Sequence, residues 1–77
     1  MHLEIISPEK IIYKGEVDMV TLPGVVGSFT ILNHHAPIIS VLKNGFVTYK
    51  SGENENKVKI NSGFAEVKQN LISVCVE

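Results

Sequence analysis

The stretch GFAEVKQNLISVCVE, residues 63–77, decides the fold class of this chain. On each side of Gln69-Asn70, apolar residues alternate with charged or small ones, which is the spacing of a half-buried β-strand. β-Branched residues, which favour strands, dominate the second half. We therefore expect strands at 63–68 and 71–76 to pair as a hairpin, whose second strand has one apolar side formed by Ile72, Val74 and Val76.

The same alternation continues upstream, where Val58 and Ile60 are separated by lysines. Turn signals built on Gly, Pro, Asn and Ser recur along the chain and leave room for strands but almost none for a helix. The polar stretch SGENEN, residues 51–56, is expected to be an exposed and mobile tip. Many short strands with such turns predict an all-β fold, a small sandwich or barrel.

Asn44-Gly45 is the strongest short hairpin signal in the sequence. A type I′ turn needs positive φ at both central residues, and Asn-Gly tolerates this best. The dipeptide therefore predicts that 38–43 and 46–51 are antiparallel neighbours.

Length and composition limit the chain to a single domain, residues 1–77, near the lower end of what one core can stabilise. No apolar run approaches the roughly 20 residues that cross a bilayer. His2, Glu4 and Pro8 interrupt the apolar stretch that a signal peptide would require. We expect a globular domain with no direct membrane insertion.

The charge pattern gives no support for nucleic-acid binding. The net charge is −1, and all seven basic residues other than histidine are lysines. Arginine, the usual bidentate ligand of phosphate and guanine, is missing. The one cysteine, Cys75, excludes an internal disulfide and a multi-cysteine zinc site.

Some predicted strands are apolar on both faces. Ile11, Ile12 and Tyr13 are consecutive, and PIISVL, residues 37–42, leaves only Ser40 to face water. A domain of this size has difficulty enclosing both sides of such strands. Two readings stay open: another protein covers one face, or loops and the opposite sheet do.

Candidate catalytic groups are present but lack a recognisable arrangement. Ser28, Ser40 and Cys75 are possible nucleophiles, and a histidine could act as the base. However, no Gly-x-Ser-x-Gly elbow occurs, and GVVGS, residues 24–28, lacks the lysine of a phosphate-binding loop. An enzyme of this kind is the least favoured reading, and no cofactor is indicated.

The stretch ILNHHAPII, residues 31–39, sets His34 beside His35 and just before Pro37. Neighbouring residues in an extended segment point to opposite faces, so the pair is a weak metal chelate. Pro37 forces Ala36 to be extended, and a stiff loop of this kind suits docking. A binding module that holds a metal or small ligand through His2, His34 and His35 stays open as an alternative.

Two longer stretches resemble one protein family. GSFTILNHHAPIISVLKNGFV is similar to the G-x-(F/L)-x-(I/L)-x-x-x-H-A-P-(I/L) segment of the epsilon subunit of F-type ATP synthase, and INSGFAEVKQNLISVCVE is similar to its G-G-F-x-E-V segment. The opening, HLEIISPEKIIYKGEVDMVTLPG, resembles the first strands of the same family. The resemblance covers essentially the whole chain.

The resemblance implies a ten-stranded β-sandwich that is a non-catalytic part of the central rotor stalk. It implies two partners, the gamma subunit and the membrane c-ring. The residues that match the motif positions at the c-ring and the foot of gamma are Ser28, Phe29, His35, Ala36 and Pro37. Weaker matching assigns Glu66, Ser73 and Val74 to the side that faces gamma.

The resemblance also implies a location at the cytoplasmic face of a bacterial inner membrane, or the organellar equivalent. Two residues depart from the motif: Ser28 stands where an acidic residue is common, and Ser62 replaces the first glycine of the Gly-Gly pair. The family's inhibitory C-terminal helical hairpin does not follow Glu77, so we expect coupling of proton flow to ATP synthesis without that inhibition.

Overall fold

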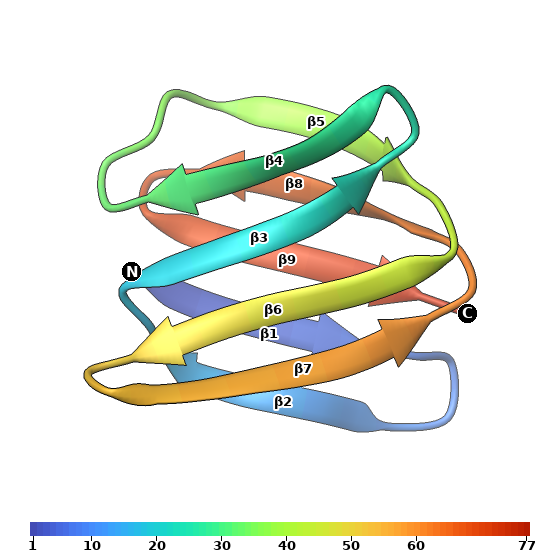
Figure 1. The fold of residues 1–77 in the computed structure, drawn as a ribbon, viewed down its shortest axis with the longest axis horizontal. Coiled ribbons are helices and arrows are strands. Elements are labelled where there is room, and N and C mark those ends of the chain that lie inside the picture. The colour runs from blue at the N-terminus through green and yellow to red at the C-terminus, as the bar shows by residue number, and fades with distance from the viewer.

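The computed structural model describes the whole chain, residues 1–77, and contains nine β-strands and no helix (Figure 1). The all-β prediction is confirmed, with nine strands in place of the ten that the family resemblance implied. No helix in the structure is long and apolar enough to cross a membrane. The strands are β1 His2–Ile6, β2 Ile11–Glu16, β3 Met19–Gly24, β4 Gly27–Leu32, β5 Ile38–Leu42, β6 Gly45–Ser51, β7 Asn54–Ile60, β8 Gly63–Lys68 and β9 Leu71–Val76.

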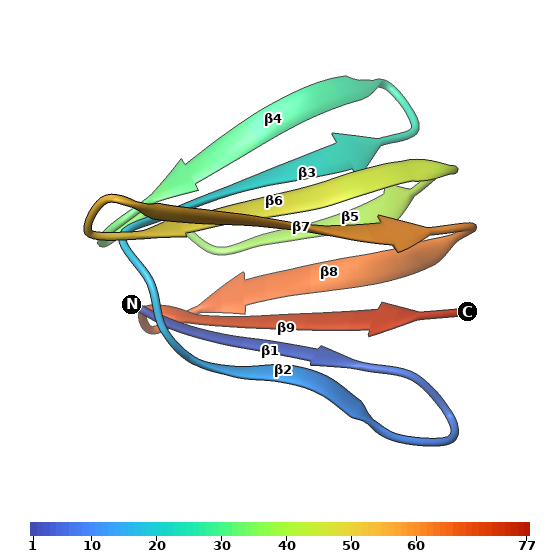
Figure 2. The ribbon, with the colours of Figure 1, turned by 60° about the horizontal axis from the view of Figure 1, so that its bottom comes forward.

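The strands form one curled sheet that folds over itself into two layers. Their order is β2-β1-β9-β8-β5-β3-β6-β7, and β4 pairs with the free side of β3. Figure 2 shows β4, β3, β6 and β7 above β8, β9, β1 and β2. In the strand register the two halves meet at one residue pair, Gly24 with Leu42, where β3 meets β5. All strand pairs are antiparallel except that of β1 with β9.

The buried core between the layers is apolar. The core contains 16 buried residues, no buried residue is polar or charged, and no buried side-chain N or O atom lacks a hydrogen-bond partner. Buried residues alternate with outward-facing ones in β1, β6, β8 and β9, as strand geometry requires. The predicted inner sides of 57–61, 63–68 and 71–76 point into this core; their buried residues are Ile60, Ala65, Val67, Ile72, Val74 and Val76.

The hairpin at the C-terminal end of the chain is confirmed. β8 and β9 pair in register from Gly63 with Val76 to Lys68 with Leu71. Gln69 and Asn70 have φ values of 51° and 61°, so both central residues of the turn are left-handed, as a primed hairpin turn requires.

The hairpin predicted at Asn44-Gly45 is wrong. β5 pairs with β8, and β6 pairs with β3 and β7, so β5 and β6 are not neighbours. Neither Asn44 nor Gly45 has a positive φ. Tertiary structure overrides the local turn signal, because the chain leaves one layer after Leu42 and enters the other at Gly45. A hydrogen bond from the Lys43 amide to the Pro23 carbonyl holds this crossing.

The tip predicted over 51–56 is shorter than expected. β6 and β7 pair as far as Ser51 with Asn54, which leaves only Gly52 and Glu53 in the turn, and Gly52 has a φ of 62°. All six residues are exposed, as expected, but most of them belong to strands.

Candidate interaction surfaces

An apolar row crosses the outer face of the layer made by β1, β9, β8 and β5. The register places Ile6 beside Cys75, Cys75 beside Phe64, and Phe64 beside Val41. Ile6, Phe64 and Val41 are exposed, and Cys75 is half-buried. These four residues, the apolar row, lie on the side of the sheet that points away from the core.

The apolar row lines the largest hollow of the molecule. The hollow has a volume of ≈ 530 Å³, is open to solvent, and extends to Pro8 and the end of β9. Single exposed apolar residues are ordinary, whereas a continuous apolar patch around a hollow marks an interaction site. We therefore regard this face as the candidate interface.

The side chains of β5 that point outward are not the ones that the sequence predicted, and the difference enlarges this apolar surface. We expected Ser40 to face water, but Ser40 is half-buried and shares the inner side with Leu42. Ile39 and Val41 point outward instead and are 73% and 59% exposed. The register of β5 against β8 sets this phase, because Leu42 is buried opposite Gly63. The PIISVL segment thus adds two apolar side chains to the outer surface.

Glu66 and Ser73 lie next to the apolar row, as directly opposed residues of β8 and β9. Glu66 is exposed and Ser73 is half-buried. Val74, which the sequence analysis grouped with them, is corrected: it is completely buried in the core and offers no surface to a partner. The period of two places Cys75, not Val74, on the outer side.

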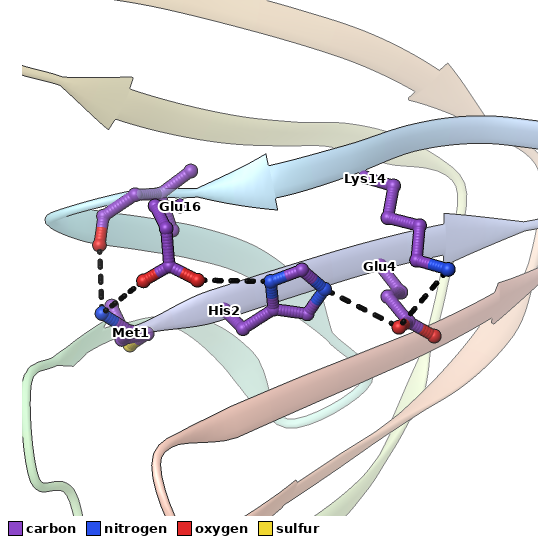
Figure 3. A network of polar contacts seen from close by, with 6 residues as sticks. Met1, His2, Glu4, Lys14 and Glu16 are labelled. Atoms are coloured by element: carbon purple, nitrogen blue, oxygen red, sulfur yellow. Dashed lines mark hydrogen bonds and ion pairs between the residues drawn. The ribbon is translucent and has the colours of Figure 1, made fainter.

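A chain of charged groups borders the same face (Figure 3). His2 lies between two carboxylates, with Nδ1 3.0 Å from Glu16 Oε2 and Nε2 3.3 Å from Glu4 Oε2. Lys14 Nζ is 4.0 Å from Glu4, and the Met1 amino group is 3.5 Å from Glu16. The contact of His2 Nδ1 with Glu16 is a hydrogen bond, and that of Nε2 with Glu4 is an ion-pair contact.

This network lowers the pKa of Glu16. The hydrogen bond with His2 is the main cause, partial desolvation opposes it, and the positive Met1 amino group adds to the lowering. The side chain of Glu16 is 75% exposed, so the effect is one of a solvated surface group.

Ser28 and Phe29 lie at the start of β4, next to the turn from β3. Ser28 is exposed opposite Pro23, and Phe29 is half-buried against the core. The turn itself carries Val25 and Val26, and Val26 is 100% exposed. This apolar tip and the apolar row are features that the sequence analysis missed. The two adjacent valines at a turn were the signal for the tip, whereas the row depends on strand register.

His35, Ala36 and Pro37 lie in the loop between β4 and β5, residues 33–37, and are all exposed. This loop lies at the opposite end of β4 from Ser28, as Figure 1 shows. The five residues matched to the c-ring and the foot of gamma are therefore two separate groups, with the length of β4 between them. The structure does not bring them together.

The loop is held by specific hydrogen bonds. The amide of His34 donates to Asn70 Oδ1 at 2.9 Å, and His35 Nδ1 donates to the Ala36 carbonyl at 2.6 Å. His34 has a φ of 64°. Pro37 fixes the exit of the loop into β5. The loop is thus short and pinned at both ends.

The structure does not bring together the residues considered from the sequence for a metal site or a hydrolase. No three His, Cys, Asp or Glu side chains come together as a metal site, so His2, His34 and His35 do not form the metal site considered from the sequence. Ser28 and His35 are separated by β4, and the Ser40 hydroxyl donates to the Val41 carbonyl. The side chains gathered on this molecule are suited to contact with another surface.

Comparison with known proteins gives a consistent result. A family model described as ATP synthase, Delta/Epsilon chain, beta-sandwich domain matches residues 1–77. The chain is 42% identical over 77 residues to the ATP synthase epsilon chain of Leptospira borgpetersenii, and 38% identical over 76 residues to that of Rhodopseudomonas palustris strain BisA53. These matches cover 100% and 99% of the chain but 61% and 56% of the relatives, so the chain spans little more than half their length.

Solved structures agree on the fold. A chain of the Euglena gracilis mitochondrial ATP synthase, OSCP/F1/c-ring assembly, superimposes with a TM-score of 0.90 at 22% identity. The match covers 96% of this chain and 48% of that one. A chain of the Tetrahymena thermophila mitochondrial ATP synthase central stalk and c-ring gives a TM-score of 0.84 at 16% identity, with coverages of 97% and 61%.

Proposed function

The chain belongs to the beta-sandwich domain family of ATP synthase delta and epsilon chains, and on this premise we propose that it is a non-catalytic part of the rotor stalk. In this role it binds the gamma subunit, contacts the c-ring and helps to couple proton translocation to ATP synthesis. The complex lies at the membrane, on the cytoplasmic face of a bacterial inner membrane or its organellar equivalent.

The observation that carries the proposal is the apolar row of Ile6, Cys75, Phe64 and Val41. These side chains lie on an outer face, so much of their apolar surface stays in water until another surface covers it. Burying one large apolar side chain contributes about 1.5–3 kcal/mol. Glu66 and Ser73 beside the row supply polar contacts that fix the orientation of the partner. We assign this face to gamma.

The two groups of matched residues at the ends of β4 are assigned to the c-ring and the foot of gamma. One group is Ser28 with Phe29, and the other is His35, Ala36 and Pro37. Ser28 is uncharged, so this chain makes the first contact without the carboxylate that is common at that motif position. The exposed valines of the adjacent tip favour an apolar contact there.

Rigidity is the property through which such a domain serves a rotor. Of 45 backbone hydrogen bonds, 38 lie within the strand ladders, and the core contains no polar residue. A body connected in this way resists bending and so transmits torque between its contacts.

Binding through the apolar row is tested with two matched variants. Phe64→Asp places a charge in the row, and Thr48→Asp places the same charge on the outer face of the other layer. We expect Phe64→Asp to weaken capture of purified gamma by about 30-fold, equivalent to about 2 kcal/mol, and Thr48→Asp to leave it unchanged. Equal capture by both variants would refute the assignment of this face.

Coupling is tested in membranes. Pull-down of the tagged chain from its native membrane should bring gamma and the c-ring with it. Deletion of the chain should lower ATP synthesis relative to proton leak. Unchanged coupling after deletion would show that the chain is not needed to link the two processes.

A further inference from the structure

Asn70 connects three parts of the chain that are distant in sequence. Its side-chain Oδ1 accepts the hydrogen bond from the His34 amide, in the loop between β4 and β5. Its backbone carbonyl accepts a hydrogen bond of 3.0 Å from the His2 amide, at the start of β1. Asn70 itself belongs to the turn between β8 and β9. Figure 1 shows this turn and the β4–β5 loop side by side at the same end of the sandwich.

Left-handed backbone is concentrated at this contact. The non-glycine residues with positive φ are His34, Gln69 and Asn70, and no others occur in the chain. Such residues cost on the order of 1 kcal/mol each and persist where the surroundings over-determine them. Strain of this kind gathers at sites where a segment must be held in one conformation.

The β8–β9 turn does not itself need the carboxamide of Asn70. A primed hairpin turn requires positive φ at its central residues, and glycine meets that requirement without strain. The carboxamide is directed instead at the neighbouring loop, where it satisfies the amide of His34. His34 is followed directly by His35, whose ring is fixed on the Ala36 carbonyl, and then by Pro37.

We propose that Asn70 is a positioning residue for the docking loop His34–Pro37. Its carboxamide holds the start of the loop while Pro37 holds the exit, so that His35 and Ala36 are presented to the partner in a fixed conformation. A loop that is ordered before binding loses less entropy on association. This inference rests on the proposed function, in which the same loop contacts the c-ring or the foot of gamma.

The test uses substitutions that separate the carboxamide from the backbone. Asn70→Gly keeps the left-handed turn and removes only the side-chain acceptor. Asn70→Asp keeps an acceptor oxygen at the same place. Gln69→Gly relieves the left-handed backbone of the same turn and leaves the carboxamide of Asn70 in place. It is the matched control.

We expect Asn70→Gly to speed hydrogen exchange at the His34 amide by about two- to tenfold, the range that a net hydrogen bond of ordinary strength gives. Its thermal unfolding midpoint should change little, since glycine tolerates this φ. Its binding to immobilised gamma–c-ring subcomplex should weaken by a similar factor. Asn70→Asp should restore both, and Gln69→Gly should alter neither. An unchanged exchange rate at His34 in Asn70→Gly would overturn the proposal.

A loop variant distinguishes this inference from the proposed function. If His35→Ala combined with Pro37→Ala weakens binding of the subcomplex and Asn70→Gly does not, the loop docks without the help of Asn70, and the inference is wrong while the function stands. If the loop variant binds as the original chain does, the docking role of the loop is refuted, and the positioning role of Asn70 is refuted with it.

Discussion

The two outer faces of the sandwich are built on the same strand geometry but differ in the row of side chains that crosses them. On the face of β1, β9, β8 and β5, the register aligns the apolar row. On the face of β4, β3, β6 and β7, the equivalent line across the strands, here called the threonine row, consists of Thr30, Thr21, Thr48 and Lys57. Thr21 and Thr30 hydrogen-bond to each other through their hydroxyl groups at 2.9 Å.

The difference shows what each face is adapted to. Threonine favours strands and leaves a hydroxyl for water, so the threonine row needs no partner. The apolar row has no hydrogen-bonding side chain to offer to water, and none of the nine strands lies over it. The inner sides of both layers meet in one apolar core, so the outer sides alone distinguish the layers.

The largest expected effect distinguishes inner from outer positions of the same layer. Truncating an inner side chain should lower the free energy of unfolding far more than truncating an outer one. Ile72 is completely buried behind the apolar row, whereas Ile39 lies on the outer side. Ile72→Ala should lower the free energy of unfolding by about 2–5 kcal/mol. Ile39→Ala should lower it by no more than about 0.5 kcal/mol. Urea denaturation measures both, and a comparable loss for Ile39→Ala would mean that the outer side is part of the core.

The second prediction concerns what covers the apolar row. Cys75 is the only cysteine and lies in that row, so its maleimide labelling reports on coverage. Assembly with gamma should slow labelling by about tenfold or more, as expected for a site at the centre of an interface. In a Cys75→Ser background, Thr48→Cys should be labelled equally in the free and assembled chain. If assembly slowed labelling at Thr48→Cys instead, gamma would cover the face of the threonine row, and the assignment of the apolar face to gamma would be wrong.

A smaller effect is expected in the threonine row. Thr30→Val removes the hydroxyl that pairs with Thr21 but keeps a β-branched side chain. Because the pair is exposed to water, the free energy of unfolding should change by no more than about 0.5 kcal/mol. Gamma binding should not change. A loss of binding in this variant would contradict the assignment of this face to solvent.

The smallest predicted effect is a pH dependence at the border of the apolar face. The pKa of Glu16 is lowered in the folded chain, so the unfolded chain takes up its proton first as pH falls. The stability that Glu16 contributes is fully present above its unfolded pKa of about 4.3 and is lost as pH falls through the lower folded value. Between pH 6 and pH 3, the midpoint of thermal unfolding should therefore depend less on pH in Glu16→Gln than in the original chain. Glu55→Gln, on the opposite face and without an ion-pair partner, is the control.

Local sequence pattern was sufficient where contacts are local. The β8–β9 hairpin was predicted with its turn, because Gln69-Asn70 is bounded by two strands that alternate correctly on their own. Asn44-Gly45 had the stronger turn signal and failed. What decides that position is the pairing of β5 with β8, residues that lie more than twenty positions away in the sequence.

The candidate site was predictable only in part for the same reason. Exposure of His35, Ala36 and Pro37 followed from the polar loop and its proline. The apolar row has members in four strands, and its alignment depends on three strand registers that a single sequence does not specify. Ser40 and Val74 were each assigned one position out of phase, and in a strand one position exchanges solvent for core.

The placement of β9 between β1 and β8 has a consequence for how the molecule is made. Among the nine strands, β1 and β2 are synthesised first, yet the inner edge of β1 pairs with β9, the last of the nine. The first hairpin must therefore wait, with its apolar side uncovered, until residue 76 is available. Chaperones that recognise nascent chains would meet this protein in that interval, and ribosome-stalled chains ending before β9 should be digested readily by protease.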